Sequence, residues 1–273
     1  MVDGFWLFDL YQYNNFLTTN NKQLSTNMLT RLNKYISDTG TCSRREADKL
    51  IEQGRVTVNG KVPELGTKVS DEDVITIDLK PLKSKEKLIY IAFNKPPGIT
   101  CTTDLKDKDN IIEFINHPKR IFPIGRLDKP SEGLIFLTND GDIVNKILRA
   151  GNNHEKEYLV MVDKPIESDF IQKMGSGVDI GDAVTKKCFV KQEADNKFRI
   201  ILTQGLNRQI RRMCDALDYK VWKLQRIRIM NVNVNGINNG GWRYLTSEEM
   251  DTINNLVANS SKTEEASVID NID

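Results

Sequence analysis

The sequence predicts an α+β protein with two domains, a small one at residues 28–80 and a larger one at residues 88–258. At 273 residues, the chain is longer than the usual single domain. Both parts mix short apolar runs of strand type with apolar residues at helical spacing. Between them, residues 81–87 are polar and basic, which is typical of a linker.

The small domain is expected to begin with two helices. Apolar residues at helical spacing predict a first helix from about residue 31, which ends at Gly40. Ser43 and Glu46 have the spacing of a capping box, so a second helix follows Ser43, and Gly54 ends it. The buried stripe of the second helix is predicted to be Ala47, Leu50 and Ile51.

Strands are predicted after these two helices. Residues 56–62 are expected to form a hairpin around Asn59 and Gly60, because this dipeptide suits a turn that needs positive φ twice. Residues 69–77 supply a further strand. The small domain is therefore predicted to be a pair of helices with a β-hairpin.

In the larger domain, strands and helices are interspersed. Apolar runs predict strands at residues 88–93, 121–124, 134–137, 154–162, 184–191, 197–203 and 221–234. Apolar stripes at helical spacing predict helices at residues 139–148, 207–217 and 246–258. Thr246 and Glu249 have the spacing of a capping box for the last of these helices.

Basic residues gather in two segments, although the formal net charge is only +1. Residues 31–61 carry a net charge of +3 and residues 207–228 one of +5, whereas residues 247–273 carry −6. Clustered positive charge attracts nucleic acids. The four cysteines are scattered without a C-x-x-C pair and the two histidines lie far apart, so we expect no disulfide framework, no metal site and a cytoplasmic location.

The two ends are expected to lie outside the folded domains. Residues 1–27 are rich in aromatic side chains, but they lack the basic N-terminal region and the cleavage site of a secretory signal. We interpret them as a disordered or non-native extension, with a short helix packed on the core as the alternative. Residues 259–273 are polar and acidic, which predicts disorder. No stretch approaches the apolar length of a membrane span, so no membrane partner is expected.

One carboxylate, Asp128, stands out in the larger domain. It lies between Arg126 and Lys129 on a loop that Gly125 and Gly133 bracket, with an apolar run on either side. A loop between two strands holds a side chain rigidly and leaves it open to a ligand. The simpler interpretation of so short a pattern is a surface turn with a charged tip.

Four motifs occur in an order that resembles the pseudouridine synthases related to the small-subunit rRNA enzyme, the RsuA family. They are Asn-Lys-Pro-Pro-Gly at 94–98, Gly-Arg-Leu-Asp with Ser-Glu-Gly-Leu-Ile-Phe-Leu-Thr at 125–138, Lys-x-Tyr at 156–158, and Asn-Arg-Gln-Ile-Arg-Arg-Met at 207–213. The small domain is similar to an S4 RNA-binding module through Ser-Arg-Arg-Glu-Ala and Val-x-Val-Asn-Gly-Lys. The resemblance covers about residues 31–258 and implies a mixed, largely antiparallel sheet flanked by helices in the larger domain.

Three residues receive roles from this resemblance. It implies that Asp128 is the catalytic carboxylate, that Tyr158 packs against the target base and that Arg211 pairs with Asp128. Taken alone, a tyrosine at the start of a strand is more often a packing residue, and arginines on one helix face are more often solvated. Pro130 stands where an acidic residue is more usual, and it is expected to stiffen the catalytic loop.

Seven basic residues are candidates for contacts with RNA phosphates. Two of them lie in the first turn of the predicted second helix, whose backbone N–H groups also attract phosphate. A third, in the Asp128 loop, would fill the space that an extruded uridine leaves or hold its phosphate. The seven candidates are Arg44, Arg45, Arg126, Arg208, Arg212, Lys223 and Arg228.

The implied reaction needs one carboxylate and no cofactor. Isomerisation of uridine breaks the N1–C1′ bond, turns the base and joins C5 to C1′, so no atom is gained or lost. The sequence has no P-loop or dinucleotide fingerprint, and no cofactor is expected. Asp128 would either attack C1′, as in a retaining glycosidase, or remove the C2′ proton to give a glycal. The sequence leaves both routes open, although the chemistry of the family favours the glycal.

Within the family, the likeness is greatest to the F-type large-subunit rRNA synthases. It implies a monomer that modifies a uridine in a stem-loop of 23S rRNA, with a tyrosine tRNA anticodon as a second target. The alternatives are a small-subunit rRNA pseudouridine synthase, a non-catalytic S4-type ribosome assembly factor and a hydrolase that uses one aspartate. The presence of Asp128, Tyr158 and Arg211 argues against the non-catalytic factor, and no second carboxylate stands where a hydrolase needs one.

Overall fold

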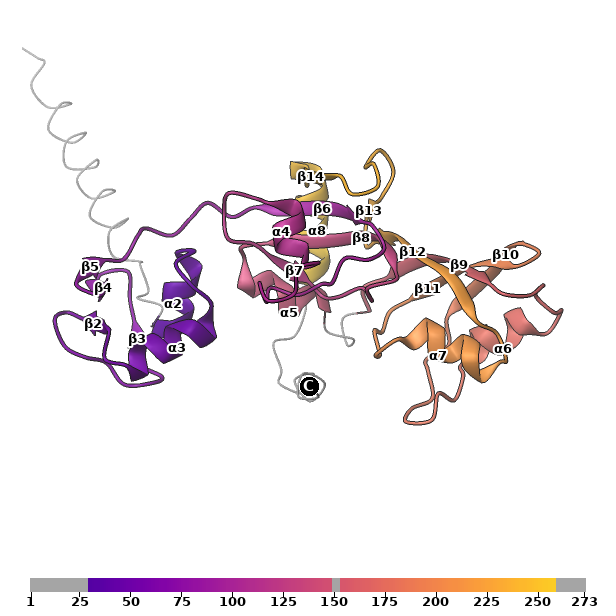
Figure 1. Cartoon of the computed structure of the whole chain (residues 1–273), viewed down its shortest axis with the longest axis horizontal. Coiled ribbons are helices and arrows are strands. Elements are labelled where there is room, and N and C mark those ends of the chain that lie inside the picture. Colours follow the sequence, from indigo (N-terminus) through magenta and orange to yellow (C-terminus); the bar gives the residue numbers. More distant parts are fainter. Residues whose placement is uncertain (1–28, 149–152, 259–273) are drawn as a thin grey trace, which may run out of the picture. The chain divides into compact units, whose positions relative to one another are not determined.

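The structure, a computed structural model, describes residues 29–148 and 153–258 (Figure 1). The expectations for residues 1–27 and 259–273 lie outside these residues. The chain divides into two compact units, Met1–Glu86 and Lys87–Asp273. No helix within the described ranges is long and apolar enough to cross a membrane.

The helices of the first unit form where the sequence predicts them. They are α2 (Leu32–Asp38) and α3 (Arg44–Glu52). The Ser43 hydroxyl accepts from the backbone N–H of Glu46, and the Glu46 carboxylate accepts from the N–H of Ser43, so the predicted capping box is present. The buried core of this unit comprises Leu32, Ile36, Ala47, Ile51, Val56, Val69 and Ile75.

Strand pairing in the first unit differs from the predicted hairpin. Asn59 and Gly60 do turn with positive φ, but the turn closes only one isolated bridge. Instead, β2 (Val56–Val58) pairs with β4 (Ile75–Ile77), which also pairs with β5 (Lys80–Pro81). This pairing of distant segments buries apolar side chains from both strands in one core, which a local hairpin would not achieve.

The predicted strand at residues 69–77 is also interrupted. Its start belongs to β3 (Lys68–Val69), which pairs with β1 (Thr30–Arg31). A turn follows, in which the Asp73 carboxylate accepts from the backbone N–H of Ser70, and β4 begins after it. Most of the predicted linker is held to the first unit, because Leu82 packs on its core and Lys85 pairs with Asp71 at 2.7 Å.

A nine-stranded sheet forms the second unit (Figure 1). Its order is β10-β11-β9-β12-β8-β6-β14, with β7 beside β8 and β13 beside β12. Among the described strands, only the contact between β12 and β8 is parallel, so the sheet is mixed and largely antiparallel, as expected. The strands are β6 (Tyr90–Lys95), β7 (Phe122–Ile124), β8 (Glu132–Thr138), β9 (Lys156–Val162), β10 (Phe189–Ala194), β11 (Lys197–Leu202), β12 (Val221–Ile229), β13 (Val232–Asn233) and β14 (Trp242–Tyr244).

One predicted strand of this unit is in fact two. The segment at residues 221–234 turns at Met230, whose φ of 52° reverses the chain, and β12 and β13 become a short hairpin. Apolar residues on both sides of the turn hide this break from the sequence pattern, because Ile229, Met230 and Val232 are all buried.

Helices cover both faces of the sheet. They are α4 (Ile111–Ile115), α5 (Gly141–Leu148), α6 (Phe170–Ser176), α7 (Gln209–Ala216) and α8 (Ser247–Ala258). The capping box of Thr246 and Glu249 is present at the start of α8. The sequence did not predict α4 and α6, because helices of five and seven residues are too short to show a period.

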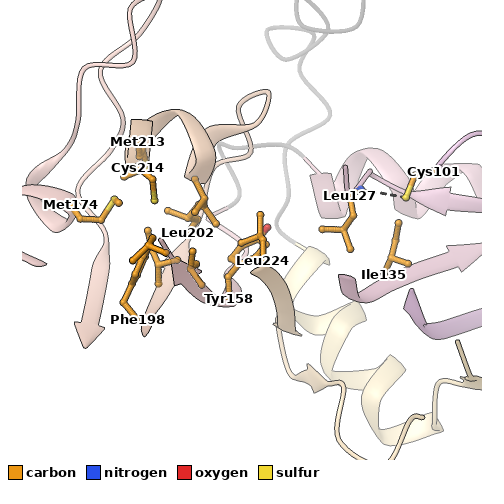
Figure 2. Close-up of a cluster of buried hydrophobic side chains, with 14 of the residues drawn as sticks. Cys101, Leu127, Ile135, Tyr158, Met174, Phe198, Leu202, Met213, Cys214 and Leu224 are labelled. Carbon is orange, nitrogen blue, oxygen red and sulfur yellow. Dashed lines mark hydrogen bonds between the residues drawn. The ribbon is translucent and has the colours of Figure 1, made fainter. Parts of the chain in front are cut away.

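Two apolar cores lie on opposite faces of the sheet. The α7-side core holds side chains from α4, α6 and α7, and it includes Phe93, Ile111, Leu127, Ile135, Tyr158, Phe170, Phe198, Ile210 and Met213 (Figure 2). The α8-side core includes Ala92, Leu134, Phe136, Ile143, Ile147, Ile253 and Val257. Successive residues of β8 alternate between the two cores, as expected for a central strand buried on both faces.

Candidate active site

Asp128 lies on the loop between β7 and β8, as predicted, and the backbone of this loop is held from several sides. The buried Lys95 Nζ donates to the Lys129 carbonyl at 3.4 Å, and the Gly98 N–H donates to the same oxygen at 2.7 Å. The Ser131 N–H donates to the Asp128 carbonyl at 2.9 Å, which closes a turn over Lys129 and the following proline. Burial lowers the pKa of Lys95, and the negative charge of Asp128 opposes this shift.

Leu127 anchors the same loop in the α7-side core. Its side chain is buried there, and its N–H donates to Cys101 Sγ at 3.4 Å (Figure 2). The side chain of Asp128 is 29% exposed. A buried residue directly before the carboxylate thus fixes the main chain while Asp128 itself remains accessible.

Two arginines approach the Asp128 carboxylate. Arg208 Nη1 and Arg211 Nε each lie 3.5 Å from Asp128 Oδ2, so the predicted pairing of Asp128 with Arg211 is present. At this distance Arg211 Nε makes an ion pair and no well-formed hydrogen bond. The Asp128 carboxylate therefore has two guanidinium groups beside it, both from the start of α7.

Arg211 is held in place by two further contacts. Its Nη1 donates to the Val221 carbonyl at 3.2 Å, and its Nη2 donates to the buried Ser131 Oγ at 3.1 Å. Burial lowers the pKa of Arg211, whereas the charge of Asp128 raises it. This guanidinium therefore links the Asp128 loop, α7 and the start of β12.

The start of α7 explains how both arginines reach one carboxylate. Arg208 precedes the helix in the left-handed region, with a φ of 46°, and Arg211 lies in its first turn. Arg212, another predicted RNA-binding residue, does not join the other two arginines at Asp128, because its guanidinium contacts Asp182 and the Ile180 carbonyl. The helix is anchored on the sheet by Ile210, Met213 and Cys214.

Tyr158 lies on β9, in the same sheet as β8, the strand that follows the Asp128 loop. It is 8% exposed and belongs to the α7-side core. In the sheet register Tyr158 of β9 is opposite Arg226 of β12, which is itself opposite Gly133 of β8. Because β12 separates β9 from β8, the backbone at Tyr158 lies two strand spacings, ~10 Å, from β8, which begins directly after the Asp128 turn.

Two cations near the site, the buried Arg226 and the half-buried Lys156, were not among the predicted site residues. Arg226 is 4% exposed, and its Nε donates to the Leu134 carbonyl at 2.6 Å, while its Nη2 has no hydrogen-bond partner. Burial, together with the charge of Arg226, lowers the pKa of Lys156 to about 8. The sequence signal that could have identified Arg226 is a charged residue within an otherwise apolar strand pattern.

The remaining RNA-binding candidates divide into two groups. Arg44, Arg45 and Arg126 are exposed, so their guanidinium groups face solvent. Lys223 pairs with Glu132 at 2.8 Å. The three exposed arginines are thus open to a phosphate, whereas Lys223 already has an acidic partner.

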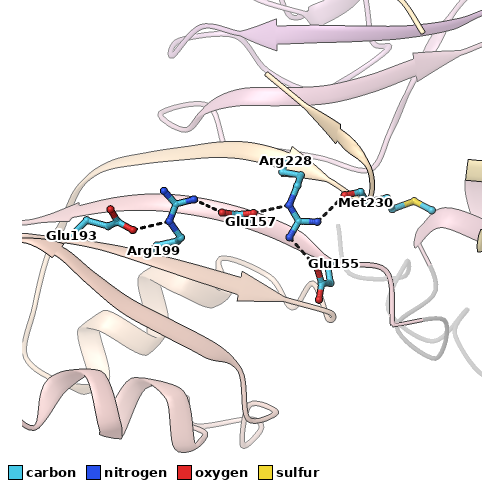
Figure 3. Close-up of polar contacts among 6 residues, drawn as sticks. All are labelled: Glu155, Glu157, Glu193, Arg199, Arg228 and Met230. Atoms are coloured by element: carbon cyan, nitrogen blue, oxygen red, sulfur yellow. Dashed lines mark hydrogen bonds and ion pairs between the residues drawn. The ribbon is translucent and has the colours of Figure 1, made fainter. Parts of the chain in front are cut away.

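Arg228 has partners that the sequence did not predict. It lies in a ladder of charges across β10, β11, β9 and β12, which consists of Glu193, Arg199, Glu157, Arg228 and Glu155 (Figure 3). Arg228 Nε is 2.6 Å from Glu157, its Nη2 is 2.9 Å from Glu155, and its Nη1 donates to the Met230 carbonyl. The side chain expected to contact RNA is thus engaged on the outer face of the sheet.

Metal ligands do not gather in the described ranges, where no three His, Cys, Asp or Glu side chains are placed to hold an ion.

Comparison with known proteins agrees with the motifs. A family model described as RNA pseudouridylate synthase matches residues 89–216, and the S4 domain model matches residues 30–75. A solved structure described as a pseudouridylate synthase superposes with a TM-score of 0.60 and 30% identity, over 82% of this chain and 99% of that chain.

Curated relatives cover most of the chain. It is 59% identical over 238 residues to the dual-specificity RNA pseudouridine synthase RluF of Salmonella typhi, which is 86% of this chain and 82% of the relative. It is also 35% identical over 229 residues to the ribosomal large subunit pseudouridine synthase B of Bacillus subtilis, which is 81% of this chain and 93% of the relative. The chain therefore belongs to the RNA pseudouridylate synthase family, in the RsuA group, and carries an S4 domain before its synthase domain.

Proposed function

We propose that this RNA pseudouridine synthase modifies one uridine in a stem-loop of 23S rRNA, that a tyrosine tRNA anticodon is its second substrate, and that Asp128 carries out the chemistry. The relatives support the choice of RNA, because they are named as a dual-specificity synthase and as a large-subunit synthase. One observation supports the role of Asp128 most directly. Its accessible carboxylate lies 3.5 Å from both Arg208 and Arg211 on a loop that is otherwise fixed.

The chemistry requires an ionised Asp128 at the ribose. The carboxylate either forms a bond to C1′ as the N1–C1′ bond breaks, or removes the C2′ proton to give the glycal. In both routes the freed base turns in the site, where Tyr158 would pack against it. C5 then joins C1′ as the bond from Asp128 to C1′ breaks or as the glycal regains a proton at C2′, and the balance is completed when C5 loses its proton and N1 gains one. Arg211 would hold the carboxylate during this rotation, because its other donors are engaged by Ser131 and Val221.

A looped substrate follows from the need to extrude the uridine. Removing a base from a helix costs a few kcal/mol, and the cost is lowest where the base is already unpaired. Arg126 is exposed two residues before Asp128, so it would fill the vacated space or hold the adjacent phosphate. A stem-loop therefore suits this site better than a continuous duplex.

Binding would be distributed over both units of one chain. Arg44 and Arg45 are exposed in the first turn of α3, where the helix N-terminus also favours phosphate. Contacts of this type read the shape of a backbone and not its sequence, which suits an enzyme with two RNA substrates. Because one chain supplies Asp128, Arg211 and Tyr158, we propose that the monomer is active.

Pseudouridine mapping of all cellular RNA tests the proposed substrates. Maps from cells that contain the gene, lack it or carry only the Asp128→Asn variant should differ at one 23S stem-loop and at the tyrosine tRNA anticodon. Lost sites confined to small-subunit rRNA would refute the proposed substrate. No lost site in any RNA would instead favour a binding factor without activity.

A further inference from the structure

Trp222 is a large side chain that lies in solvent beside the Asp128 site. It belongs to β12 and is 69% exposed. The register of β12 against β9 shifts between Val221 and Lys223, so Trp222 has no residue opposite it. Val221 and Leu224 both pack toward the α7-side core, and the bulge turns the two residues between them outward.

Two structural links place Trp222 at the rim of the site. The carbonyl of Val221, the preceding residue, accepts from Arg211 Nη1 at 3.2 Å, and Nε of the same guanidinium is 3.5 Å from Asp128. In the parallel pairing of β12 with β8, Gln225 is opposite Glu132. Because the two strands run in the same direction, Trp222, three residues before Gln225, and the Asp128 turn, which precedes Glu132, lie toward the same end of this contact.

The surroundings of Trp222 suit a nucleic acid. Arg208 is exposed and lies 3.5 Å from Asp128, and Lys223 follows Trp222 directly with an exposed side chain. An aromatic face among cations is the combination that binds single-stranded nucleic acid, because bases stack on the ring while the cations hold the backbone.

Within the described residues, Trp222 also makes no ring contact. By contrast, Trp242 of β14 packs edge-on against His117 at 5.7 Å and against Tyr244 at 5.4 Å, so its ring already has neighbours. Trp242 is therefore the natural control for Trp222.

We propose that Trp222 is a stacking platform for an unpaired RNA base next to the target uridine. The inference rests on the proposed role of Asp128 as the reacting carboxylate, because Asp128 defines where the uridine lies. Extrusion of a uridine removes the stacking partner of its neighbour, and the exposed indole face replaces that partner. Stacking tolerates any base, so this contact is compatible with more than one RNA substrate.

The test compares Trp222→Ala, Trp222→Phe and Trp242→Phe in the full chain. The probe is whichever RNA stem-loop the wild-type chain isomerises, from 23S rRNA, small-subunit rRNA or tRNA, so an error in the proposed substrate changes the probe and not the result. The Trp222→Ala variant should bind this probe roughly 5- to 150-fold more weakly, while Trp222→Phe retains most of the affinity. Trp242→Phe should bind as the wild type does.

Probes with an abasic site on either side of the uridine identify the base that stacks. One of these two probes should bind the wild type more weakly than the intact RNA does. The Trp222→Ala variant should bind that probe and the intact RNA equally well, as expected when the missing base and Trp222 are in direct contact. The salt dependence of binding should be unchanged in Trp222→Ala, because no phosphate contact is removed. Lys223→Ala is the comparison here, since loss of a phosphate contact would lower the slope by about 1.

Tryptophan fluorescence tests the stacking directly, because RNA would not quench the emission of Trp222 if this residue only stabilised the fold. RNA should quench the emission of the wild type and of Trp242→Phe, and the quenching should be much smaller in Trp222→Phe. Equal affinity of Trp222→Ala and wild type, or equal quenching with and without Trp222, would overturn the proposal. Failure of Asp128→Asn to block isomerisation would instead refute the proposed function.

Discussion

At the scale of single residues, the properties of Asp128 depend on its neighbours. The carboxylate meets two guanidinium groups, and Arg211 is itself fixed by Ser131 and by the Val221 carbonyl. A planar guanidinium carries its donors on three separate nitrogens and so reaches these partners in different directions, whereas a lysine carries all its donors on one atom. In the proposed reaction the loop would present a preorganised charge to the ribose, and little reorganisation would be needed.

Asp128→Asn should abolish isomerisation and leave RNA binding largely intact. An amide is neither a nucleophile nor a base, whereas the binding cations of the chain are unchanged. Single-turnover assays on the substrate stem-loop and a binding titration measure the two properties. Asp215→Asn, a half-exposed aspartate of α7 that pairs with Lys220, is the matched control and should retain activity. Isomerisation at the wild-type rate by Asp128→Asn would disprove the assignment.

At the scale of elements, the parallel contact between β8 and β12 positions the site. Gly133 makes this contact possible, because a Cβ at this position would lie 2.7 Å from the Arg226 nitrogen and closer still to its carbonyl oxygen. Its φ of 104° is also unfavourable for residues with a side chain. The catalytic turn ends directly before this strand, so its position depends on the approach of the two backbones.

Gly133→Ala should lower the free energy of unfolding by roughly 3 kcal/mol or more, because a clash with backbone is added to an unfavourable φ. Gly181→Ala is a close control, since Gly181 has a φ of 97° and nothing lies within 4 Å of the place that an added Cβ would take. Chemical denaturation of both variants separates the cost of the backbone clash, which only Gly133→Ala incurs, from the cost of the unfavourable φ, which both variants share. Equal losses in the two variants would show that the close approach of β8 and β12 has no energetic consequence.

The charge ladder joins four strands on the outer face of the same sheet (Figure 3). Glu157 is at its centre and is 8% exposed. Burial raises the pKa of Glu157, but the hydrogen bonds from Arg228 and Arg199 outweigh it, and the pKa is lowered overall. A folded pKa below the unfolded value means that the ion pairs stabilise the protein above the unfolded pKa, and that this stabilisation is lost as the pH falls through the folded pKa.

Glu157→Gln should therefore reduce the Tm at pH 7. A loss of about 2 kcal/mol would lower the Tm by roughly 4–8 °C, and the difference from the wild type should shrink in acid below about pH 4. Glu248→Gln, an exposed glutamate in the first turn of α8, is the control and should change the Tm little. Thermal melts across the pH range measure this, and a difference that does not depend on pH would contradict the role of the charge.

At the scale of the whole molecule, RNA binding is divided between two units that each have their own core. In the proposed function, the first unit contributes the exposed Arg44 and Arg45 at a helix N-terminus, and the second contributes Asp128 and its guanidinium partners. Each phosphate contact adds ~0.7–0.9 to the salt dependence of binding, so the two contributions can be separated by experiment.

The chain shortened to residues 87–273 should fold but bind RNA more weakly, with a salt slope smaller by about 2 if Arg44 and Arg45 each hold one phosphate. The double variant Arg44→Gln and Arg45→Gln in the full chain should show the same change of slope. Binding titrations at several salt concentrations measure both proteins. An unchanged slope in the double variant would mean that other residues of the first unit contact the RNA.

The structural predictions from sequence succeeded where local interactions decide. The capping boxes at Ser43 and Thr246 and the positive φ at Asn59 and Gly60 are present, because each depends on residues a few positions apart. The motif order also led to the family, and the resemblance predicted the pairing of Asp128 with Arg211, which are 83 positions apart in the sequence.

By itself, the sequence determined five of the seven described helices, the capping boxes at Ser43 and Thr246, the family and the carboxylate expected to react. Only the tertiary structure decided that β2 pairs with β4, that Arg228 is bound by two glutamates whereas Arg208 faces Asp128, and that a bulge turns Trp222 outward. A periodic pattern shows which side chains are apolar, but it does not show which distant segment they meet. Strand partners and ion pairs depend on how the whole chain packs, because their energies come from contacts between residues far apart in sequence.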